Sequence, residues 1–400
     1  MISFSEAVAA IIAQKAEWGS ETVPLEEAAG RVLNEEIAAD RDYPPFNRAT
    51  MDGYAVRTAD ILEKGIRQFR VVGEIFAGSG DTIAVGSGEA VKIMTGAPVP
   101  DTADAVIRRE DAVEERGMVT FHIDEFKWHQ SIAKKGEDIS SGRVVMSKPV
   151  RIGPAQLAVL SSLGRRTVRV MRLPRVALCS TGNEIRPIGA EVAPFQIRDA
   201  NRYSIEGFLR QHLIRPVSAQ IVPDEPEALT RTIAPLLEED LVIITGGVSA
   251  GDADFVPAAL QSCGVKELFH KVKIRPGKPL WFGMHEGGAR VMALPGNPFS
   301  VQVGCRLFIE PLLRASFRLP QAEPITIPLG SMRKKRTHLD EFFPARLSHE
   351  GSVSVEHLLY NTSGDITAAL DTDGIVRHPA AAGDLAKQEA VQMYLWQPLR

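Results

Sequence analysis

The chain has 400 residues, of which 44% are hydrophobic and 24% are charged, a composition typical of a globular protein with about two to four domains. Its 46 basic and 50 acidic residues give a formal net charge of -4, which provides no general attraction to nucleic acid or to an anionic membrane. No apolar run reaches the roughly 18 residues that a membrane-spanning helix requires. We therefore expect a cytoplasmic protein with no nucleic-acid or membrane partner.

The N-terminal part of the chain predicts helices on both sides of a β-rich segment. Ser3 and Glu6 have the spacing of a capping box, and apolar residues then recur at helical intervals. Residues 152–164 predict another helix, whereas residues 66–125 consist of short alternating segments separated by Gly and Pro. We expect a helical domain, residues 1–40 completed by 140–168, that carries an inserted β-rich domain of residues 41–139.

From about residue 169, predicted strands alternate with predicted helices. This alternation indicates a mostly parallel sheet that helices cover on both faces. We place this α/β domain at residues 169–317. A Pro-rich stretch at 318–328 follows, and short alternating runs after it predict a small C-terminal β domain, barrel-like, at residues 318–400.

Three predicted strand ends in the α/β domain carry unusual loops, "STGNE", "TGGVSAGDADF" and "LPGNPFS". Ligands of open α/β sheets bind beyond the carboxyl ends of the strands, and glycines let backbone N–H groups approach a phosphate. Each loop alone is more often a plain turn, and none matches a P-loop or a dinucleotide motif. Three such loops in one domain nevertheless favour a binding site. The candidate residues are Glu184, Gly246, Gly247, Ser249, Asp254, Pro295, Asn297, Pro298 and Ser300.

Basic residues crowd the stretch "KVKIRPGKP", where Lys271, Lys273, Arg275 and Lys278 fall within eight positions. On a strand, the first three would share one face. The plain interpretation is an exposed edge strand protected by charges. The functional interpretation is a phosphate or oxyanion site, which the rigid "RPGKP" turn favours.

Acidic residues outside these loops suggest a ligand that is more than a phosphate. Asp52 lies in "PPFNRATMDGYAV" and Asp138 in "KKGEDIS"; either could be a turn residue, and Asp224 is most simply a helix N-cap. Carboxylates fit a phosphate site only if they hold a divalent cation or accept N–H and O–H donors. The implied ligand therefore carries both phosphate and a polar heterocycle or sugar.

Seven motifs together carry a family resemblance. In order, they are "PPFNRATMDGYAVR", "MTGAPVP", "KKGEDIS", "STGNE", "TGGVSAGDADF", "RPGKP" and "LPGNPFS". Over essentially its whole length, the chain resembles the molybdopterin molybdenumtransferases of the MoeA family, which are similar to the E domain of gephyrin. Single motifs are unspecific, but seven in this order are highly specific.

The resemblance implies an enzyme of molybdenum cofactor biosynthesis. Such enzymes insert molybdate at the dithiolene sulfurs of adenylylated molybdopterin and release AMP, with help from a divalent cation, usually Mg²⁺. It also implies a homodimer of four-domain subunits, each with a MogA-like three-layer α/β domain. The active cleft would lie between that domain of one subunit and the inserted β domain of the other. Possible further partners are the molybdopterin adenylyltransferase and downstream molybdoenzymes or chaperones.

The family's motifs also imply roles for individual residues. Glu184 and Asp254 would lie near the cation and the anhydride, while Asp52 and Thr95 would come from the other subunit. Lys271, Arg275, Lys278 and the glycine-rich strand ends would hold the phosphates or the molybdate. The residues implied as catalytic are Asp52, Thr95, Asp138, Glu184 and Asp254, with Asp224 as a further polar residue.

The sequence departs from the family pattern at several places, and alternatives remain open. Lys134 and Lys135 stand where arginines are frequent, Arg275 stands where lysine is frequent, and "NTSGDITAAL" in the C-terminal domain is dissimilar. The alternative functions are adenylyl transfer to molybdopterin, a non-catalytic role as cofactor carrier or scaffold, and a related enzyme specific for tungstate.

Overall fold

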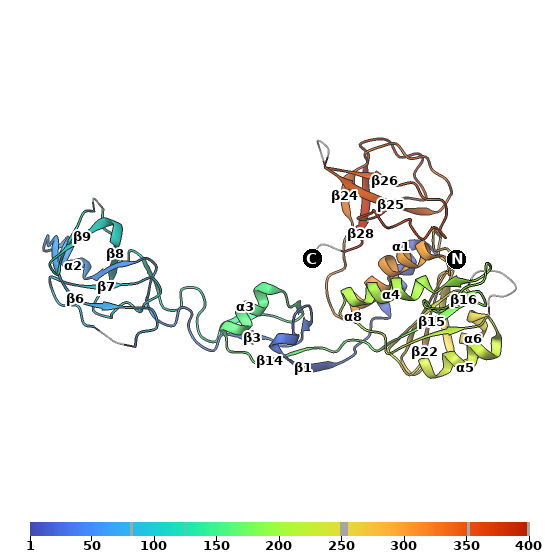
Figure 1. Cartoon of the computed structure of the whole chain (residues 1–400), viewed down its shortest axis with the longest axis horizontal. Helices are drawn as coiled ribbons and strands as arrows, with labels where there is room; N and C mark the ends of the chain where they lie inside the picture. The colour runs from blue at the N-terminus through green and yellow to red at the C-terminus, as the bar shows by residue number, and fades with distance from the viewer. Residues whose placement is uncertain (81–82, 124, 249–254, 350–352, 398–400) are drawn as a thin grey trace. The chain divides into compact units, whose positions relative to one another are not determined.

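The computed structural model in Figure 1 describes residues 1–80, 83–123, 125–248, 255–349 and 353–397. The chain divides into two compact units. Unit 1 comprises Met1–Asn34, Pro149–Ala158 and Arg166–Arg400, and unit 2 comprises Glu35–Lys148 and Val159–Arg165. Within the described ranges, no helix has the length and apolar character needed to cross a membrane.

The first helix, α1 (Phe4–Ala13), begins at the predicted capping box. The Glu6 amide donates to Ser3 Oγ at 3.2 Å, and the Ser3 amide donates to Glu6 Oε2 at 2.7 Å. The buried side chains of the helix, including Phe4 and Ile11, join the core beside the α/β sheet. The helix thus covers the α/β sheet rather than starting a separate helical domain.

The helical prediction for residues 1–40 is wrong beyond α1. These residues form η1 (Leu25–Glu27) and the strands β1 (Ser20–Pro24), β2 (Val32–Leu33) and β3 (Ile37–Ala38). Leu33 pairs with Val150 and with Val170, so pairing with distant segments overrides the local helical pattern.

A four-stranded antiparallel sheet stands where helices were expected. Its order is β1-β14-β2-β13, in which β13 is Val150–Arg151 and β14 is Thr167–Met171. The predicted helix over 152–164 is confirmed as α3 (Pro154–Ser162). Because strands from both sides of residues 35–148 pair with each other, that segment is inserted between them. The four predicted domain boundaries stay predictions.

Unit 2 is built on a six-stranded sheet of order β8-β5-β7-β6-β10-β9, with an α2 helix (Thr58–Leu62) beside it. Its pairs are antiparallel except β6 with β7. Two apolar clusters fill its opposite faces. The strands are β5 (Gly53–Val56), β6 (Gln68–Ile75), β7 (Glu89–Ile93), β8 (Ala105–Arg108), β9 (Ala112–Glu115) and β10 (Met118–Phe121).

Two short ribbons complete unit 2. In one, β3 pairs with β12 (Val144–Met146), and in the other β4 (Arg48–Ala49) pairs with β11 (Ile132–Ala133). The second ribbon joins the "NRATMDG" loop to the segment that leads into "KKGED".

The main sheet of unit 1 confirms the predicted α/β layering. Its order is β18-β15-β19-β23-β22-β20; the first four strands are parallel, and β22 runs antiparallel to both of its neighbours, β23 and β20. The strands are β15 (Val176–Thr181), β18 (Ser218–Val222), β19 (Leu241–Thr245), β20 (Val265–His270), β22 (Trp281–His285) and β23 (Arg290–Leu294). A two-residue ribbon of β16 (Ile185–Arg186) and β17 (Ile197–Arg198) follows β15.

Helices lie on both faces of this sheet (Figure 1). One face packs against α1, α4 (Ala200–Gln211) and a continuous helical stretch of α7 (Pro298–Gly304), η3 (Cys305–Ile309) and α8 (Glu310–Ser316). The other face packs against α5 (Pro226–Leu236) and α6 (Val256–Ser262). From β15 the chain runs first to β18 on one side and then to β19 on the other. The carboxyl ends of β15 and β19 therefore flank a topological switch point, where open α/β sheets bind ligands.

The C-terminal residues form a predominantly antiparallel sheet, as predicted. The order is β21-β25-β27-β28-β24, β26 pairs with β25, and a bridge from Leu329 to Val355 connects the two ends of the sheet. The strands are β21 (Ile274–Arg275), β24 (Ile325–Pro328), β25 (Asp340–Ser348), β26 (Ser354–His357), β27 (Gly374–His378) and β28 (Ala390–Leu395).

The basic stretch does not form one continuous strand. β20 ends at His270, Lys271 adopts a left-handed φ of 71°, and only Ile274 and Arg275 pair, with β25. Burial still alternates, with Val272 and Ile274 buried between the basic residues. Lys273 and Arg275 are exposed and Lys271 is half-buried; Arg275 lies on the two-residue edge strand β21, whereas the two lysines lie on the loop before it.

Candidate active site

Asp52 and Thr95 meet at one end of the unit 2 sheet. Asp52 Oδ1 accepts hydrogen bonds from the Thr95 amide and the Thr95 hydroxyl, both at 2.7 Å. Both side chains are exposed. The amide donor first, and then the hydroxyl donor, hold the pKa of the Asp52 carboxyl below its ordinary value. The structure thus presents an ionised carboxylate in a fixed orientation.

Asp138 belongs to the same group of loops. The Asp138 amide donates to the Tyr43 carbonyl at 3.0 Å, and the Lys135 amide donates to Asn47 Oδ1 at 3.0 Å. The β4–β11 ribbon joins the two segments further along. The predicted residues Asp52, Thr95 and Asp138 therefore lie on three loops that the hydrogen bonds of unit 2 hold together.

Large apolar side chains are exposed on these loops. Phe46, Met51 and Phe76 are 39%, 47% and 55% exposed. Phe46 and Met51 belong to the loop that carries Asp52, and Phe76 directly follows β6. Polar site residues beside exposed apolar ones are typical of a surface that meets another molecule.

In unit 1, glycines follow the strands that flank the switch point. Gly246 and Gly247 have φ of 94° and 62°, a conformation that favours glycine. A Cβ on Gly246 would lie 2.5 Å from the Thr181 carbonyl oxygen, and one on Gly247 would lie 2.6 Å from Val256 Cγ2. Only glycine fits at these two positions, so the loop backbone stays close to the end of β15.

Two acidic candidates lie beside these glycines. Glu184 is exposed on the turn after β15, and its carboxylate lies 2.8 Å from the position of a Cβ on Gly182. Asp224 Oδ1 lies 3.6 Å from the position of a Cβ on Gly247. The N-cap interpretation of Asp224 is wrong, because α5 has Glu225 at its N-cap and no side-chain cap bond. Asp224 faces the strand ends instead.

Two predicted residues, Ser249 and Asp254, lie outside the described residues. Among the described ones, no group of three His, Cys, Asp or Glu side chains could hold a metal ion. Mg²⁺ often uses only one or two protein carboxylates together with substrate phosphates. The exposed carboxylate of Glu184 is compatible with that kind of site.

The "LPGNPFS" loop contacts the C-terminal domain. Asn297 Nδ2 donates to Ser363 Oγ at 2.8 Å, the Phe299 amide donates to the Ser363 carbonyl at 3.1 Å, and the Phe299 and Tyr360 rings are 5.2 Å apart. Pro295 is buried and Pro298 opens α7, in which Ser300 is only 2% exposed. The dissimilar "NTSGD" segment therefore packs against one of the candidate loops, a contact that the sequence did not predict.

Tyr360 lies among cationic side chains. Burial raises the pKa of its hydroxyl, and the charges of Arg333, Arg275 and Arg336 oppose that rise. Arg333 pairs with Glu341, whereas Arg275 and Arg336 form no ion pair with any described residue. The neighbourhood therefore has a surplus of positive charge between the α/β domain and the C-terminal sheet, although sequence reasoning had missed Tyr360 and Arg336.

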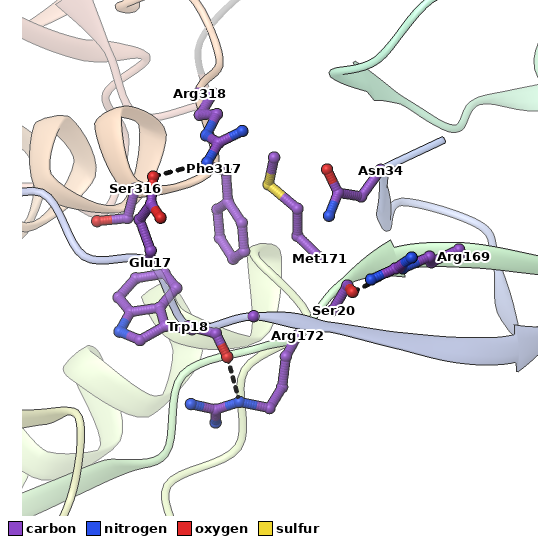
Figure 2. Close-up of a pocket in the computed structure, with 11 residues that line it drawn as sticks. Glu17, Trp18, Ser20, Asn34, Arg169, Met171, Arg172, Ser316, Phe317 and Arg318 are labelled. Atoms are coloured by element: carbon purple, nitrogen blue, oxygen red, sulfur yellow. Dashed lines mark hydrogen bonds and ion pairs between the residues drawn. The ribbon is translucent and has the colours of Figure 1, made fainter. Parts of the chain in front are cut away.

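Two cavities of unit 1 lie away from these residues. One, of about 240 Å³, is lined by side chains such as Trp18, Phe317 and Arg318 (Figure 2), and another, of about 310 Å³, lies beside α4. Two arginines at the first cavity form ion pairs: Arg318 with Glu17 at 2.6 Å and Arg172 with Asp240 at 2.9 Å. Neither cavity contains a predicted site residue.

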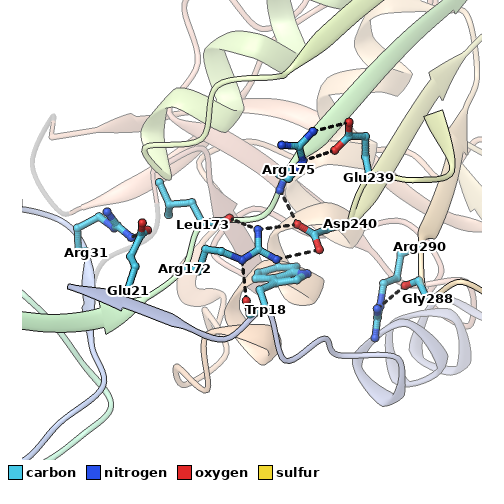
Figure 3. A network of polar contacts seen from close by, with 10 residues as sticks. All are labelled: Trp18, Glu21, Arg31, Arg172, Leu173, Arg175, Glu239, Asp240, Gly288 and Arg290. Atoms are coloured by element: carbon cyan, nitrogen blue, oxygen red, sulfur yellow. Dashed lines mark hydrogen bonds and ion pairs between the residues drawn. The ribbon is translucent and has the colours of Figure 1, made fainter. Parts of the chain in front are cut away.

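A polar network next to the first cavity holds the segments that adjoin β1 and β14 of the four-stranded sheet. Arg172 donates to both oxygens of Asp240, at 2.9 and 3.0 Å, and to the Trp18 carbonyl at 2.7 Å (Figure 3). Arg290 donates to the carbonyls of Gln14 and Lys15. These contacts tie the segments next to β1 and β14 to the α/β sheet, a structural role.

Comparisons with known proteins identify the family. A model of the MoeA N-terminal region (domain I and II) matches residues 2–164, and one described as "Probable molybdopterin binding domain" matches residues 179–315. The molybdopterin molybdenumtransferase of Synechococcus elongatus is 34% identical over 371 residues, 89% of this chain and 90% of that one. The chain belongs to the MoeA family.

Other MoeA family members agree over the full length. The molybdopterin molybdenumtransferase of Bacillus subtilis is 30% identical and covers 98% of this chain and 94% of its own. A solved molybdopterin biosynthesis MoeA protein from Pyrococcus horikosii is 32% identical, with a TM-score of 0.83 over 100% of both chains. The predicted family and a MoeA-like fold are thus confirmed, while the roles of individual residues stay predictions.

Proposed function

We propose that this protein is a molybdopterin molybdenumtransferase, which inserts molybdate into adenylylated molybdopterin and releases AMP. One observation carries the proposal beyond family membership. In unit 1, the "LPGNPFS" loop follows the switch-point sheet and, through the contact of Phe299 with Tyr360, reaches the neighbourhood of Arg275 and Arg336, which form no ion pair among the described residues. A ligand with a ring at one end and phosphate or molybdate at the other matches both features.

The cationic side chains near Tyr360 would stabilise the negative charge that develops on the leaving phosphate. Arg275 is exposed and has no ion pair within the described residues, and Lys278 is exposed three positions further along. Fixed cations in a partly enclosed site stabilise such charge without reorganisation. Glu184 and Asp254 would hold Mg²⁺, which would neutralise phosphate charge when bound. We expect no covalent enzyme intermediate.

We propose that the site is completed by a second copy of the chain. Asp52, Thr95 and Asp138 would then reach the α/β domain of the partner subunit in a homodimer. The exposed Phe46 and Met51 support this assignment, because apolar side chains next to the polar ones would be covered there. The proposed subunit has four domains, including a MogA-like α/β domain, and acts in the cytoplasm.

A direct test measures molybdenum on the pterin. Purified protein is incubated with adenylylated molybdopterin, Mg²⁺ and molybdate, and bound molybdenum is quantified after gel filtration, with the Arg275→Ala variant as control. The proposal predicts molybdenum on the pterin with the wild type and much less with the variant. Tight pterin binding without molybdenum transfer would instead indicate a carrier or scaffold. Transfer of tungsten in preference to molybdenum would indicate the tungstate enzyme, and AMP attachment from ATP would indicate adenylyl transfer.

A further inference from the structure

Arg306 is a buried arginine whose two terminal nitrogens are not used by the protein. The residue is only 3% exposed, and its Nε donates to the Leu395 carbonyl at 2.6 Å. Among the described residues, nothing accepts a hydrogen bond from either terminal nitrogen, and no carboxylate forms an ion pair with Arg306. Arginines are almost never fully buried unless they are paired, because an uncompensated charge is costly to remove from water. A partner from outside the described chain would satisfy this side chain.

The nearest acid, Glu310, is shared by two other basic side chains. Its Oε2 lies 3.3 Å from His212 Nε2, and its Oε1 lies 3.4 Å from Arg314 Nη1. Burial lowers the pKa of the Arg306 guanidinium, and the charge of Glu310 opposes this effect only in part. Two arginines and one glutamate therefore leave one positive charge uncompensated at Arg306.

Arg306 lines the cavity of about 310 Å³ that lies beside α4. Three aromatic side chains also line it: Tyr203 and Phe208 belong to α4, and Trp396 follows β28. Within the described wall of this cavity, Arg306 is the only charged residue. The cavity thus combines one buried cation with an aromatic interior.

The backbone and two contacts hold the Arg306 side chain in place. The helical stretch changes at Cys305 from α7 to the π-helix η3, in which Arg306 is the second residue. Hydrogen bonds in a π-helix span one residue more than in an α-helix, and such segments frequently occur at functional sites. The Arg306 Cζ also lies 5.7 Å from the centroid of the Tyr394 ring, a cation–π contact. The free N–H groups are therefore fixed in position before any ligand binds.

A carboxylate on an apolar body matches this cavity. A guanidinium presents its N–H donors in a planar fork that suits the two oxygens of a carboxylate. A doubly charged phosphate would need a second cation, which the described lining residues do not provide. The neutral amides of Gln211 and Gln302 also line the cavity and can orient a polar group on the ligand.

We propose that this cavity binds a small aromatic carboxylic acid, whose carboxylate pairs with Arg306 and whose ring lies among Tyr203, Phe208 and Trp396. Its volume is at the lower end of the range of about 300–1,000 Å³ for ligand pockets, which suits a molecule of one or two rings. None of the residues assigned to the proposed reaction lines this cavity. The cavity is therefore a second site, and either proposal can fail without the other.

The first experiment compares two probes that differ in charge but hardly in shape. 2-Naphthoate and its neutral amide, 2-naphthamide, are titrated into the full-length protein at neutral pH by calorimetry. We expect naphthoate to bind roughly 10-fold more tightly or better, the effect of hydrogen bonds to a charged group. Equal affinity of the two probes, or no binding of naphthoate, would overturn the proposal.

Competition separates this cavity from other anion sites. AMP should not displace naphthoate, because AMP belongs to the site of the proposed reaction. Displacement by AMP would place naphthoate in that site and overturn the proposal. Displacement by inorganic phosphate at the same concentration would indicate a general anion site and overturn the carboxylate assignment.

Arg306→Met and Arg210→Met form a matched pair of variants. Each loses one positive charge, but Arg210 lies on α4 and does not line the cavity. The Arg306 variant should bind naphthoate roughly 10-fold more weakly or worse and bind naphthamide like the wild type. The Arg210 variant should bind both probes like the wild type. Unchanged affinity of a folded Arg306 variant for naphthoate would overturn the proposal.

Gly207→Leu provides a test that does not depend on the folding of the Arg306 variant. Gly207 lines the cavity, and a Cβ there would meet nothing within 4 Å, so the helix can accept a larger side chain. The leucine should fill the cavity and abolish binding of both probes, while thermal unfolding stays close to that of the wild type. Wild-type affinity in this variant would show that the probes bind elsewhere and would overturn the proposal.

Discussion

Thr95 holds the Asp52 carboxylate with two donors on a single oxygen, its amide and its hydroxyl, each at 2.7 Å. Among the described residues, no hydrogen bond to the second carboxylate oxygen is present, which leaves it for other partners. This contact joins the "MDG" loop to the "MTG" loop, 43 positions along the chain, and adds to the pairing of Gly53 with Ile93 and to the hydrogen bond from the Gly96 amide to the Ala49 carbonyl.

Asp52→Ala should lower turnover by roughly 100-fold or more, the range of a catalytic acid or base. Because the Asp52 side chain is exposed, the unfolding midpoint should stay close to that of the wild type. Steady-state rates and thermal unfolding of the same samples test both parts. Global unfolding of this variant would contradict the site assignment.

Thr95→Val should move the acidic limit of activity upward. The folded pKa of Asp52 is lowered, so the ionised form persists above that pKa and is lost as the pH falls through it. The Val variant removes one of the two donors, and the pKa therefore rises toward its ordinary value. A pH–rate profile should lose activity at a higher pH than the wild type does, with Thr95→Ser as the control that retains the hydroxyl.

Mixing two inactive variants should restore activity if the site is shared between subunits. A dimer of one Asp52→Ala and one Arg275→Ala subunit contains one intact site when the two residues act across the interface. Random reassociation then gives roughly a quarter of the wild-type activity, since half the dimers are mixed and half of their sites are intact. No recovery from confirmed mixed dimers would place both residues of a site in one subunit.

Arg275→Ala should weaken binding of AMP, with a smaller effect at high salt. An exposed cation attracts phosphate through a field that salt screens over about 10 Å at 0.1 M. Arg275→Lys keeps the charge and should retain most of the affinity, although it loses the bidentate geometry. Titrations at two ionic strengths provide the measurement, and an equal loss at both would argue against an electrostatic role.

Gly246→Ala should destabilise the protein by about 1–2 kcal/mol or more, the cost of a left-handed residue with a Cβ. The added Cβ would also meet the Thr181 carbonyl oxygen at 2.5 Å. Gly207→Ala is a matched control within α4, where a Cβ has open space, and it should stabilise by up to about 1 kcal/mol. Chemical denaturation of the two variants would show opposite signs.

The sequence predicted the α/β layering well because its strands are continuous apolar runs such as Val176–Leu178, and its helices follow at short intervals. It failed for residues 25–38, where "LEEAAGRVLNEEI" has helical character but Leu33 is drawn into a sheet by Val150 and Val170. Local propensity contains no information on partners more than 100 positions away.

For the candidate site, too, the sequence revealed some residues and missed others. Motifs identified Asp52, Thr95 and Glu184, because polar residues beside Gly and Pro stand out in a sequence. Tyr360 was missed because its cationic environment includes Arg275, which lies 85 positions earlier in the chain but close in space.

The most direct test of the central claim is AMP release from adenylylated molybdopterin by the purified protein with Mg²⁺, in the presence and absence of molybdate. The account predicts release that depends on molybdate, with molybdenum retained on the pterin. Binding of the substrate with no release of AMP under either condition would contradict it.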